Sequence, residues 1–215
     1  MEELAKMAWC DGKEASIETP RRTRQALGQG AWVEHEPGWI EPSEADHLLV
    51  ALREELAWEQ RAVVLFGRPI LQPRLIAWGG DVGYRYSGQT LEPRALTATV
   101  AALRARVREH TGIPFNHILV NRYRTGDDSI GLHADDEPAL GDEPVVATVS
   151  LGVARRLVLV GRRKSDGPRR FFDLGHGALF VMGGACQRHF RHGIPRAPGV
   201  CAERISLTFR RILAT

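Results

Sequence analysis

The second half of this sequence is a series of short β-type runs, and this feature restricts the possible folds most. The runs cover residues 117–124, 145–151, 156–160, 177–183 and 203–212, and Gly, Pro or charged turns separate them. Many short strands of this kind predict a β-sandwich or a jelly roll. The chain has no internal repeat, so a solenoid or propeller is not expected. The expected fold class is therefore α+β or mainly β.

Two amphipathic helices are expected ahead of these strands. The first begins at Pro42-Ser43-Glu44, with Ser43 as its expected cap, and the second covers about 95–110, where Gly112 and Pro114 end it. Their apolar faces consist of Leu48, Leu49, Leu52 and Leu56 in the first helix and of Leu96, Val100, Leu103 and Val107 in the second. Both helices should pack against one sheet and brace it.

The chain of 215 residues is expected to form one domain, over 31–215, behind a weakly organised extension over 1–30. A hydrophobic content of 43% is typical of a globular protein. No run of apolar residues approaches the length of a membrane span, so no membrane association is expected. The three cysteines include no close pair, which favours a reducing compartment, and we expect the protein to be cytoplasmic.

The formal net charge is +3, and the basic residues are clustered. The clusters are Arg21-Arg22-Thr23-Arg24, Arg162-Arg163-Lys164, Arg169-Arg170 and the stretch from Arg188 to Arg196. Clustered basic residues suit a polyanionic partner such as nucleic acid. Arginine-rich loops on an ordinary soluble surface would give the same pattern.

His133-Ala134-Asp135 is a candidate metal motif. On an extended segment, residues two apart point to the same side, so the imidazole and the carboxylate can converge on one ion. A second, distant histidine would complete a two-His-one-carboxylate site for Fe(II), which leaves positions open for a chelating cosubstrate and O₂. The candidates for that histidine are His176, His189 and His192, and spacing alone does not choose between them. A surface turn in an acidic stretch is the alternative interpretation of the motif.

The run Arg204-Ile-Ser-Leu-Thr-Phe-Arg210 alternates strictly between polar and apolar residues. The apolar set must face a core, so the polar set faces water or a lined cavity. Arginine suits a carboxylate because its planar fork can bind both oxygens, and two arginines suit a dicarboxylate. Asn121 and Tyr123 alternate in the same way in the run before His133, where they could hydrogen-bond the same ligand.

The order of these motifs resembles the AlkB family of nucleic-acid dealkylating dioxygenases. The resemblance runs from about Trp32 to Ile212 and is strongest from Asn121 to Pro138. Val149-Ser-Leu-Gly, the turn Leu174-Gly-His-Gly-Ala-Leu and the two arginines of the last run follow in the family's order. Within the family, the sequence looks most similar to the second and third human homologues and their bacterial relatives.

The resemblance implies a fold, a metal and a cosubstrate. The fold is a double-stranded β-helix, or jelly roll, braced by the N-terminal helices. The family's second metal histidine lies shortly before a proline, as His192 does before Pro195, so His133, Asp135 and His192 would be the Fe(II) ligands and the catalytic centre. The implied cosubstrate is 2-oxoglutarate, with its contacts at Asn121, Tyr123, Arg204, Ser206 and Arg210. The family usually has asparagine where Ser206 stands here.

The resemblance also implies a base-recognition region over about 60–92 and five substrate contacts. Leu65-Phe66-Gly67 looks like the finger that fills the gap left by a flipped base, although Phe66 could equally be a core residue. Tyr84 and Tyr86 match aromatic residues of the family's base pocket, and a flipped base needs such a stacking surface. Glu137 matches an acidic residue that contacts the base edge, and Asp136 beside it is the fifth expected contact.

The implied activity is oxidative demethylation of bases such as N1-methyladenine and N3-methylcytosine in DNA, with RNA as a further substrate, and with release of formaldehyde. The enzyme is expected to be a monomer. One alternative is a 2-oxoglutarate oxygenase of the same fold that acts on a protein or a small molecule. Another is a non-catalytic nucleic-acid-binding module, which the complete set of metal and arginine positions disfavours.

Overall fold

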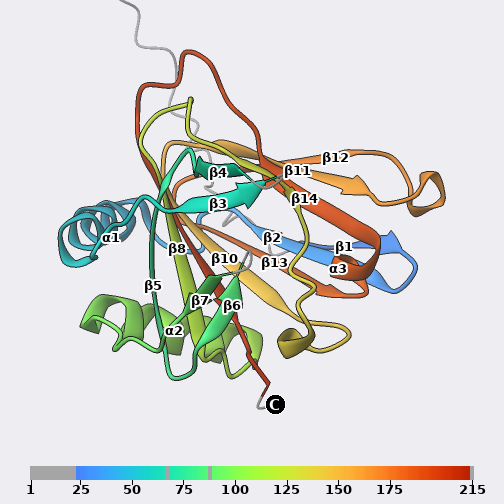
Figure 1. Cartoon of the computed structure of the whole chain (residues 1–215), viewed down its shortest axis with the longest axis horizontal. Helices are drawn as coiled ribbons and strands as arrows, with labels where there is room; N and C mark the ends of the chain where they lie inside the picture. The colour runs from blue at the N-terminus through green and yellow to red at the C-terminus, as the bar shows by residue number, and fades with distance from the viewer. Residues whose placement is uncertain (1–22, 66–67, 87–88, 214–215) are drawn as a thin grey trace, which may run out of the picture.

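The computed structural model describes residues 23–65, 68–86 and 89–213, which form two main antiparallel sheets and two small hairpins (Figure 1). In spatial order, the larger sheet contains β1 (Thr23–Gly28), β2 (Ala31–Glu36), β13 (Ala178–Gly184), β10 (Val146–Gly152), β15 (Arg204–Arg210), β8 (His117–Tyr123) and β5 (Leu75–Gly80). The smaller sheet contains β12 (Arg170–Leu174), β11 (Arg155–Gly161), β14 (Phe190–Ile194) and β9 (Ile130–His133). This arrangement is the expected mainly β jelly roll with a few helices.

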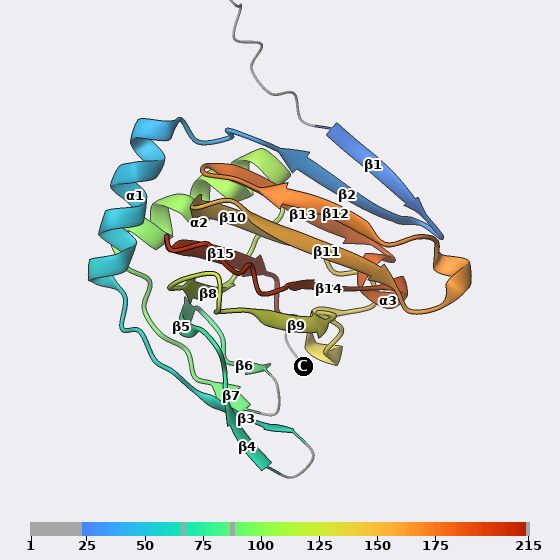
Figure 2. The ribbon, with the colours of Figure 1, turned by 90° about the horizontal axis from the view of Figure 1, so that it is seen from above.

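The hairpins and helices complete the architecture. The hairpins pair β3 (Ala62–Leu65) with β4 (Arg68–Leu71) and β6 (Tyr84–Tyr86) with β7 (Gln89–Leu91). The helices are α1 (Pro42–Glu55), α2 (Ala98–Thr111) and the short α3 (Cys186–His189), with 3-10 turns at Pro138–Leu140 and Lys164–Asp166. Figure 2 shows both hairpins projecting from the same side of the body, beyond β5 and β9.

The two faces of β15 contact different parts of the protein. Ile205, Leu207 and Phe209 are fully buried in the core layer that also contains residues of α1 and α2. Arg204, Ser206, Thr208 and Arg210 line a cavity on the opposite face. The alternation in the sequence therefore predicted both faces of this strand correctly, because successive side chains of a strand point to opposite sides.

The two longer helices brace the larger sheet, as expected. Val100, Leu103 and Val107 of α2 and Ala45 and Leu52 of α1 are buried against it. Figure 1 shows both helices on the side away from β11, β12 and β14.

The ends of these helices differ in part from the sequence analysis. α2 begins after Thr97, whose hydroxyl accepts a hydrogen bond from the Val100 amide, and ends at Gly112 in the left-handed conformation. The expectation that Ser43 caps α1 was wrong. Glu41 is the cap residue, and Ser43 lies inside the first turn because Pro42 is already helical.

The folded domain begins earlier than the sequence suggested. The expected extension over 1–30 includes Thr23–Gly28, which is an edge strand paired with β2. Gly28 and Gly30 have positive φ in the tight turn that joins the two strands, a conformation that glycine adopts without strain. Residues 1–22 lie outside the described residues.

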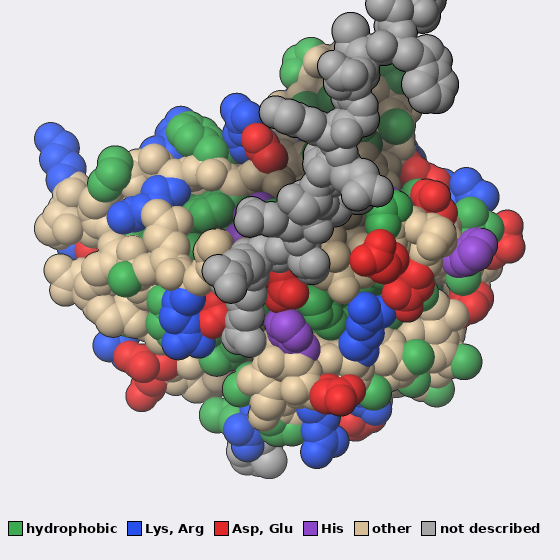
Figure 3. Space-filling model, turned by 180° about the vertical axis from the view of Figure 1, so that it is seen from behind, with side chains coloured by type: hydrophobic (Ala, Val, Ile, Leu, Met, Phe, Trp, Pro, Cys, Tyr) green, Lys and Arg blue, Asp and Glu red, His purple; other side chains and the backbone are tan. Residues whose placement is uncertain are grey.

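The surface seen from behind carries mixed charge. Figure 3 shows Lys and Arg side chains interspersed with Asp and Glu over this face. Arg106 pairs with Glu44 and Arg104 with Asp81, so basic side chains of α2 already have acidic partners. None of the helices in the described ranges is long and apolar enough to cross a membrane.

Candidate metal and cosubstrate site

A cavity lies between the two sheets, and it contains about 440 Å³ of space free of protein atoms, part of it open to solvent. The polar side chains that line it come from both sheets: Asn121, Tyr123, His133, Thr148, His192, Arg204, Ser206, Thr208 and Arg210. The apolar part of the wall consists of Leu119, Ile130, Leu157, Leu174 and Ile194, from β8, β9, β11, β12 and β14. Seven of the eight residues that the sequence assigned to metal and cosubstrate therefore share one cavity, and the eighth, Asp135, is buried beside it.

The expected metal ligands lie at one end of this cavity. His133 of β9 and His192 of β14 are paired across the smaller sheet, and their ring centroids are 4.3 Å apart. Asp135 follows β9, and its Oδ2 atom lies 4.0 Å from His192 Nε2. The strand pairing thus brings together residues that are 57 to 59 positions apart in the sequence (192 − 135 and 192 − 133).

Neighbouring groups fix the orientation of these side chains. Arg210 donates a hydrogen bond from Nη2 to Asp135 Oδ1 over 2.8 Å, and both side chains are almost fully buried. The Asp135 amide donates to Gln187 Oε1 over 3.0 Å, and His133 Nδ1 lies 2.9 Å from the Gly131 carbonyl oxygen. A bond of this kind to Nδ1 leaves Nε2 as the atom that can bind a metal.

The environment keeps these groups in the protonation states that metal ligands need. Burial lowers the pKa of His192 to about 3, and the nearby His133 adds to that effect. Burial also lowers the pKa of His133, although Asp135 opposes this. For Asp135, burial alone would raise the pKa, but Arg210 and the two histidines outweigh it and lower the pKa to about 2. At neutral pH both imidazoles are uncharged and the carboxylate is ionised, as metal binding requires.

Buried polar atoms without partners support a ligand site here. Asp135 Oδ2 and His192 Nδ1 are buried and have no hydrogen-bond partner within the described ranges. Among the described residues, no group of three His, Cys, Asp or Glu side chains is arranged so that it could hold a metal ion as it stands, and Asp135 Oδ1 bonds to Arg210. The donor types, their protonation states and the open carboxylate oxygen nevertheless fit Fe(II).

The two other candidate histidines lie elsewhere. His176 Nδ1 accepts a hydrogen bond from the Gly152 amide over 2.9 Å, and its ring reaches the start of α1. His189 Nδ1 lies 3.2 Å from Asp166 Oδ1. Neither is among the described residues that line the cavity, so the geometry favours His192.

Arg204 lies at the other end of the cavity and is 1% exposed. Its Nε donates to Ser150 Oγ over 2.9 Å, and its guanidinium carbon lies 5.3 Å from the Tyr123 ring centroid. Burial lowers the pKa of Arg204 to about 10, so the group stays cationic at neutral pH. Its Nη1 atom is buried without a hydrogen-bond partner in the described part of the chain. A buried cation with a free donor is suited to an anionic ligand.

Asn121 and Ser206 stand side by side between the two arginines, in register across β8 and β15. Asn121 Oδ1 accepts a hydrogen bond from Arg74 Nε over 2.7 Å, which leaves the amide NH₂ as its free donor group. Ser206 is 3% exposed and lines the cavity at the position where the family usually has asparagine.

Unlike the metal and cosubstrate residues, the expected substrate contacts do not share one cavity. Tyr84 is 2% exposed, and its ring lies 4.9 Å from that of His117 and 5.6 Å from the Arg210 guanidinium, so it lies behind the cavity wall. Asp136 is exposed and paired with Arg162. Glu137 is half-buried, and burial raises the pKa of its carboxyl, while Tyr84 opposes that shift. Phe66 and the Tyr86 side chain lie outside the described residues.

Four residues that support the site were not expected from the sequence. Arg74, Ser150 and Gln187 hold Asn121, Arg204 and Asp135, and His117 packs on Tyr84 behind Arg210. Ser150 could have been found, since it alternates with apolar residues in its run. Gln187 lies in a single helical turn, and no sequence pattern marks it.

Comparison with known proteins identifies relatives of this chain. The family model described as the 2OG-Fe(II) oxygenase superfamily matches residues 33–210. The chain is 37% identical over 187 residues to alpha-ketoglutarate-dependent dioxygenase alkB homolog 3 of Rattus norvegicus, a match that covers 82% of this chain and 62% of that protein. It is 37% identical over 184 residues to DNA oxidative demethylase ALKBH2 of Homo sapiens, covering 80% and 70%.

The chain spans less than two thirds of the length of the homolog 3 proteins that it matches. Among solved structures, OsALKBH1 superposes with a TM-score of 0.59 at 17% identity, covering 88% of this chain and all of that one. That likeness supports the fold alone.

Proposed function

This chain belongs to the 2OG-Fe(II) oxygenase superfamily, and we propose that it is an oxidative demethylase of N-alkylated bases in nucleic acid. The observation that carries the proposal is the shared cavity of His133, His192 and the two arginines, with Asp135 buried beside it. The named relatives include a DNA oxidative demethylase at 37% identity, which supports the choice of substrate class. The product is the unmodified base, with formaldehyde as the second product.

His133, Asp135 and His192 would hold Fe(II). When bound, the metal together with 2-oxoglutarate and O₂ supplies the oxidation of the methyl C–H bond, with succinate and CO₂ as co-products. The chain's own contribution is to present two neutral imidazoles and one ionised carboxylate at the same point. Arg210 keeps Asp135 ionised and fixes its rotation.

The two arginines of β15 would determine the orientation in which 2-oxoglutarate binds in the cavity. Arg210 lies beside Asp135, so it marks the metal end, and Arg204 marks the far end, where its unpartnered Nη1 can bind the second carboxylate. Asn121 and Ser206 lie between them and can donate to oxygens of the same ligand. Burial of both arginines keeps water from competing for these contacts.

The acidic residue that follows the metal motif suits a base with a positive charge. Glu137 follows the metal motif, and its half-buried carboxyl can contact a cationic methylated base such as N1-methyladenine or N3-methylcytosine. The hairpins β3–β4 and β6–β7, which project beyond β9, would support the nucleic acid (Figure 2). We propose DNA as the main substrate and RNA as a further one, and a monomer acting in the cytoplasm.

The test is formaldehyde release from synthetic oligonucleotides. Purified protein with Fe(II), ascorbate and 2-oxoglutarate is given N1-methyladenine or N3-methylcytosine in single-stranded DNA, duplex DNA or RNA, and succinate is measured in parallel. We expect formaldehyde from at least one methylated strand and none from the unmethylated strand of the same sequence. Asp135→Asn should abolish both products, and Asp173→Asn is its matched control, because Asp173 is exposed and pairs with Arg156 at the surface.

Two results would contradict parts of this proposal. If 2-oxoglutarate is converted to succinate but no methylated DNA or RNA raises that rate, the protein is an oxygenase of another substrate, such as a protein or a small molecule. If Asp135→Asn leaves succinate production intact, the assignment of the metal site is wrong.

A further inference from the structure

Arg155 is a buried cation on a face that is otherwise apolar. It is the first residue of β11, where Arg155, Leu157 and Leu159 face inward and Arg156 between them is exposed. Leu157 lines the cavity, whereas Arg155 lies one step beyond it and is only 2% exposed. A buried guanidinium is costly unless hydrogen bonds compensate it, so its contacts must explain its presence.

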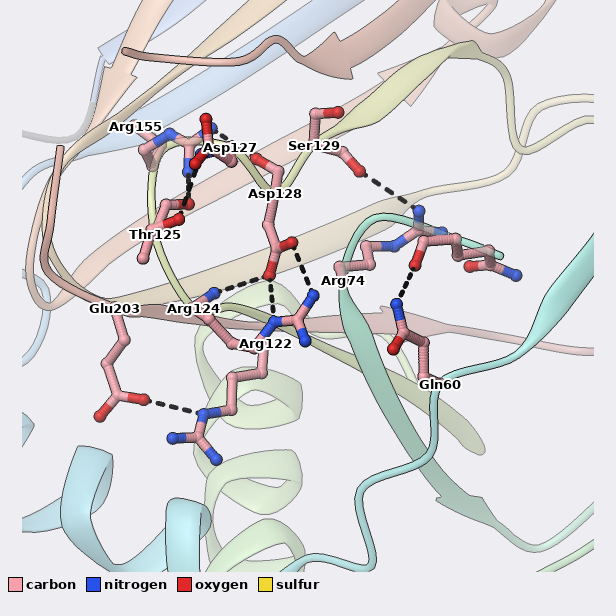
Figure 4. Close-up of polar contacts among 11 residues, drawn as sticks. Gln60, Arg74, Arg122, Arg124, Thr125, Asp127, Asp128, Ser129, Arg155 and Glu203 are labelled. Carbon is pink, nitrogen blue, oxygen red and sulfur yellow. Dashed lines mark hydrogen bonds and ion pairs between the residues drawn. The ribbon is translucent and has the colours of Figure 1, made fainter. Parts of the chain in front are cut away.

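Those contacts join two loops that are far apart in the sequence, and Figure 4 shows Arg155 beside Thr125 and Asp128 of the first loop. Arg155 Nη1 donates to the Thr125 carbonyl oxygen over 3.0 Å, and Nη2 donates to the carbonyl oxygens of Asp128 and Pro195, each over 2.8 Å. The first two acceptors lie in the loop that follows β8, and the third lies in the segment that follows β14. The arginine guanidinium, with five donors in a planar fork, can satisfy three carbonyls at once.

The same two loops also bond to each other directly. The Gly126 amide donates to the Val200 carbonyl over 2.7 Å, and the Ala197 amide donates to the Gly126 carbonyl over 2.8 Å. The approach is so close that a Cβ atom on Gly126 would lie 1.9 Å from the Ala197 oxygen. Residues 125–128 and 195–200 therefore form one closed unit, which we call the clasp.

The clasp adjoins the Arg204 end of the cavity. Tyr123 lies two residues before it in the chain, and the Tyr123 ring centroid lies 5.5 Å from the Arg155 guanidinium carbon and 5.3 Å from that of Arg204. Ile194, directly before Pro195, lines the cavity. A loss of Arg155 would therefore loosen two cavity walls at the end where Arg204 has its free donor, while the metal end would keep its own contacts.

We propose that Arg155 is a positioning residue for the cosubstrate: it holds the clasp closed and thereby fixes Tyr123 and Arg204 around the far carboxylate of 2-oxoglutarate. This inference rests on the proposed function for the identity of the ligand. It predicts that Arg155 affects the affinity for 2-oxoglutarate without contacting it, and that it leaves metal binding and the catalytic step largely unchanged.

The test measures 2-oxoglutarate binding without turnover, by calorimetry on protein loaded with Mn(II) and without nucleic acid. We expect Arg155→Met to weaken binding at least tenfold and Arg155→Lys to weaken it less, while the affinity for Mn(II) alone stays within threefold. Arg156→Met is the matched control, because Arg156 is the adjacent, exposed residue and pairs with Asp173 at the surface. In steady state, the KM for 2-oxoglutarate should rise far more than kcat falls.

Hydrogen exchange of the wild-type protein gives a second test that needs no variant. The amides of Gly126, Ala197 and Val200 should exchange slowly, and 2-oxoglutarate with Mn(II) should slow them further. Exchange rates at these amides that are the same with and without the ligand would overturn the proposal. In Arg155→Met the same amides should exchange at least tenfold faster. A folded Arg155→Met that binds 2-oxoglutarate within twofold of wild type would also overturn it. If the wild-type protein binds no 2-oxoglutarate at all, the proposed function itself fails.

Discussion

Replacing Arg210 by methionine should destabilise the metal-free protein by about 3 kcal/mol at pH 7. Methionine keeps most of the apolar stem but removes the charge that faces Asp135 at 2.8 Å. The lowering of the Asp135 pKa from 3.8 to about 2 corresponds to roughly 2 kcal/mol of stabilisation of the ionised form. Losing one partner of a buried pair costs about 3–5 kcal/mol, because the other charge stays buried without compensation. For a chain of this size the melting temperature should fall by about 6–12 °C.

The pH dependence of this effect has a definite sign. In the wild-type protein, the Asp135 pKa is lower when folded than when unfolded, so its stabilising contribution is complete above pH 3.8 and is lost as the pH falls toward 2. In Arg210→Met, burial is left as the main influence and raises the Asp135 pKa, so the folded variant takes up a proton more readily than the unfolded chain. The stability difference between the two proteins should therefore shrink as the pH is lowered from 7 toward 4.

The assay is urea unfolding in the presence of a chelator at several pH values. The control is Asp135→Asn with and without Arg210→Met, because the neutral amide leaves no buried charge for Arg210 to compensate. The arginine substitution should cost much less in the Asp135→Asn background than in the wild-type background. A cost below about 0.5 kcal/mol at pH 7, or an equal cost in both backgrounds, would refute the reasoning.

Two further predictions concern packing. Leu207→Ala should lower the free energy of unfolding by about 2–5 kcal/mol, because Leu207 is fully buried in the layer under the helices. The folded variant should still bind 2-oxoglutarate within threefold of the wild-type affinity, as measured by calorimetry. A tenfold loss of affinity would contradict the separation of the two faces of β15. Gly183→Ala should cost about 1–3 kcal/mol in urea unfolding, because its Cβ would lie 2.1 Å from Trp32 Cζ2. Gly175→Ala, whose Cβ would meet open space, should change stability by less than about 0.5 kcal/mol, and equal effects at the two positions would disprove this packing argument.

The strands with clear periodicity could be predicted from the sequence, and so could the residues that they carry. The strict alternation of β15 predicted that Arg204 and Arg210 face water or a lined cavity, and in the structure both line the cavity. β9, β12 and β14 were not delimited. β9 has only four residues, none of them buried. On β12, Phe172 and Leu174 face inward, but the exposed Phe171 between them hides the alternation that marks a strand.

The third proposed metal ligand could not be chosen from sequence spacing. His176, His189 and His192 are equivalent in a list of histidines, and the pairing of β14 with β9 is what brings only His192 to His133. That pairing is a long-range contact, and local sequence carries no signal for it. Arg155 is a comparable case: its alternation with Leu157 and Leu159 marks it as inward-facing, but the carbonyls that it binds come from loops whose positions only the fold determines.

The most direct test of the account is an anaerobic titration with Fe(II) in the presence of 2-oxoglutarate, followed by the visible charge-transfer absorption of the complex. The account predicts one Fe(II) per chain for the wild-type protein and for His189→Ala, and none for His192→Ala at the same concentrations. Iron binding that survives His192→Ala but is lost in His189→Ala would contradict it.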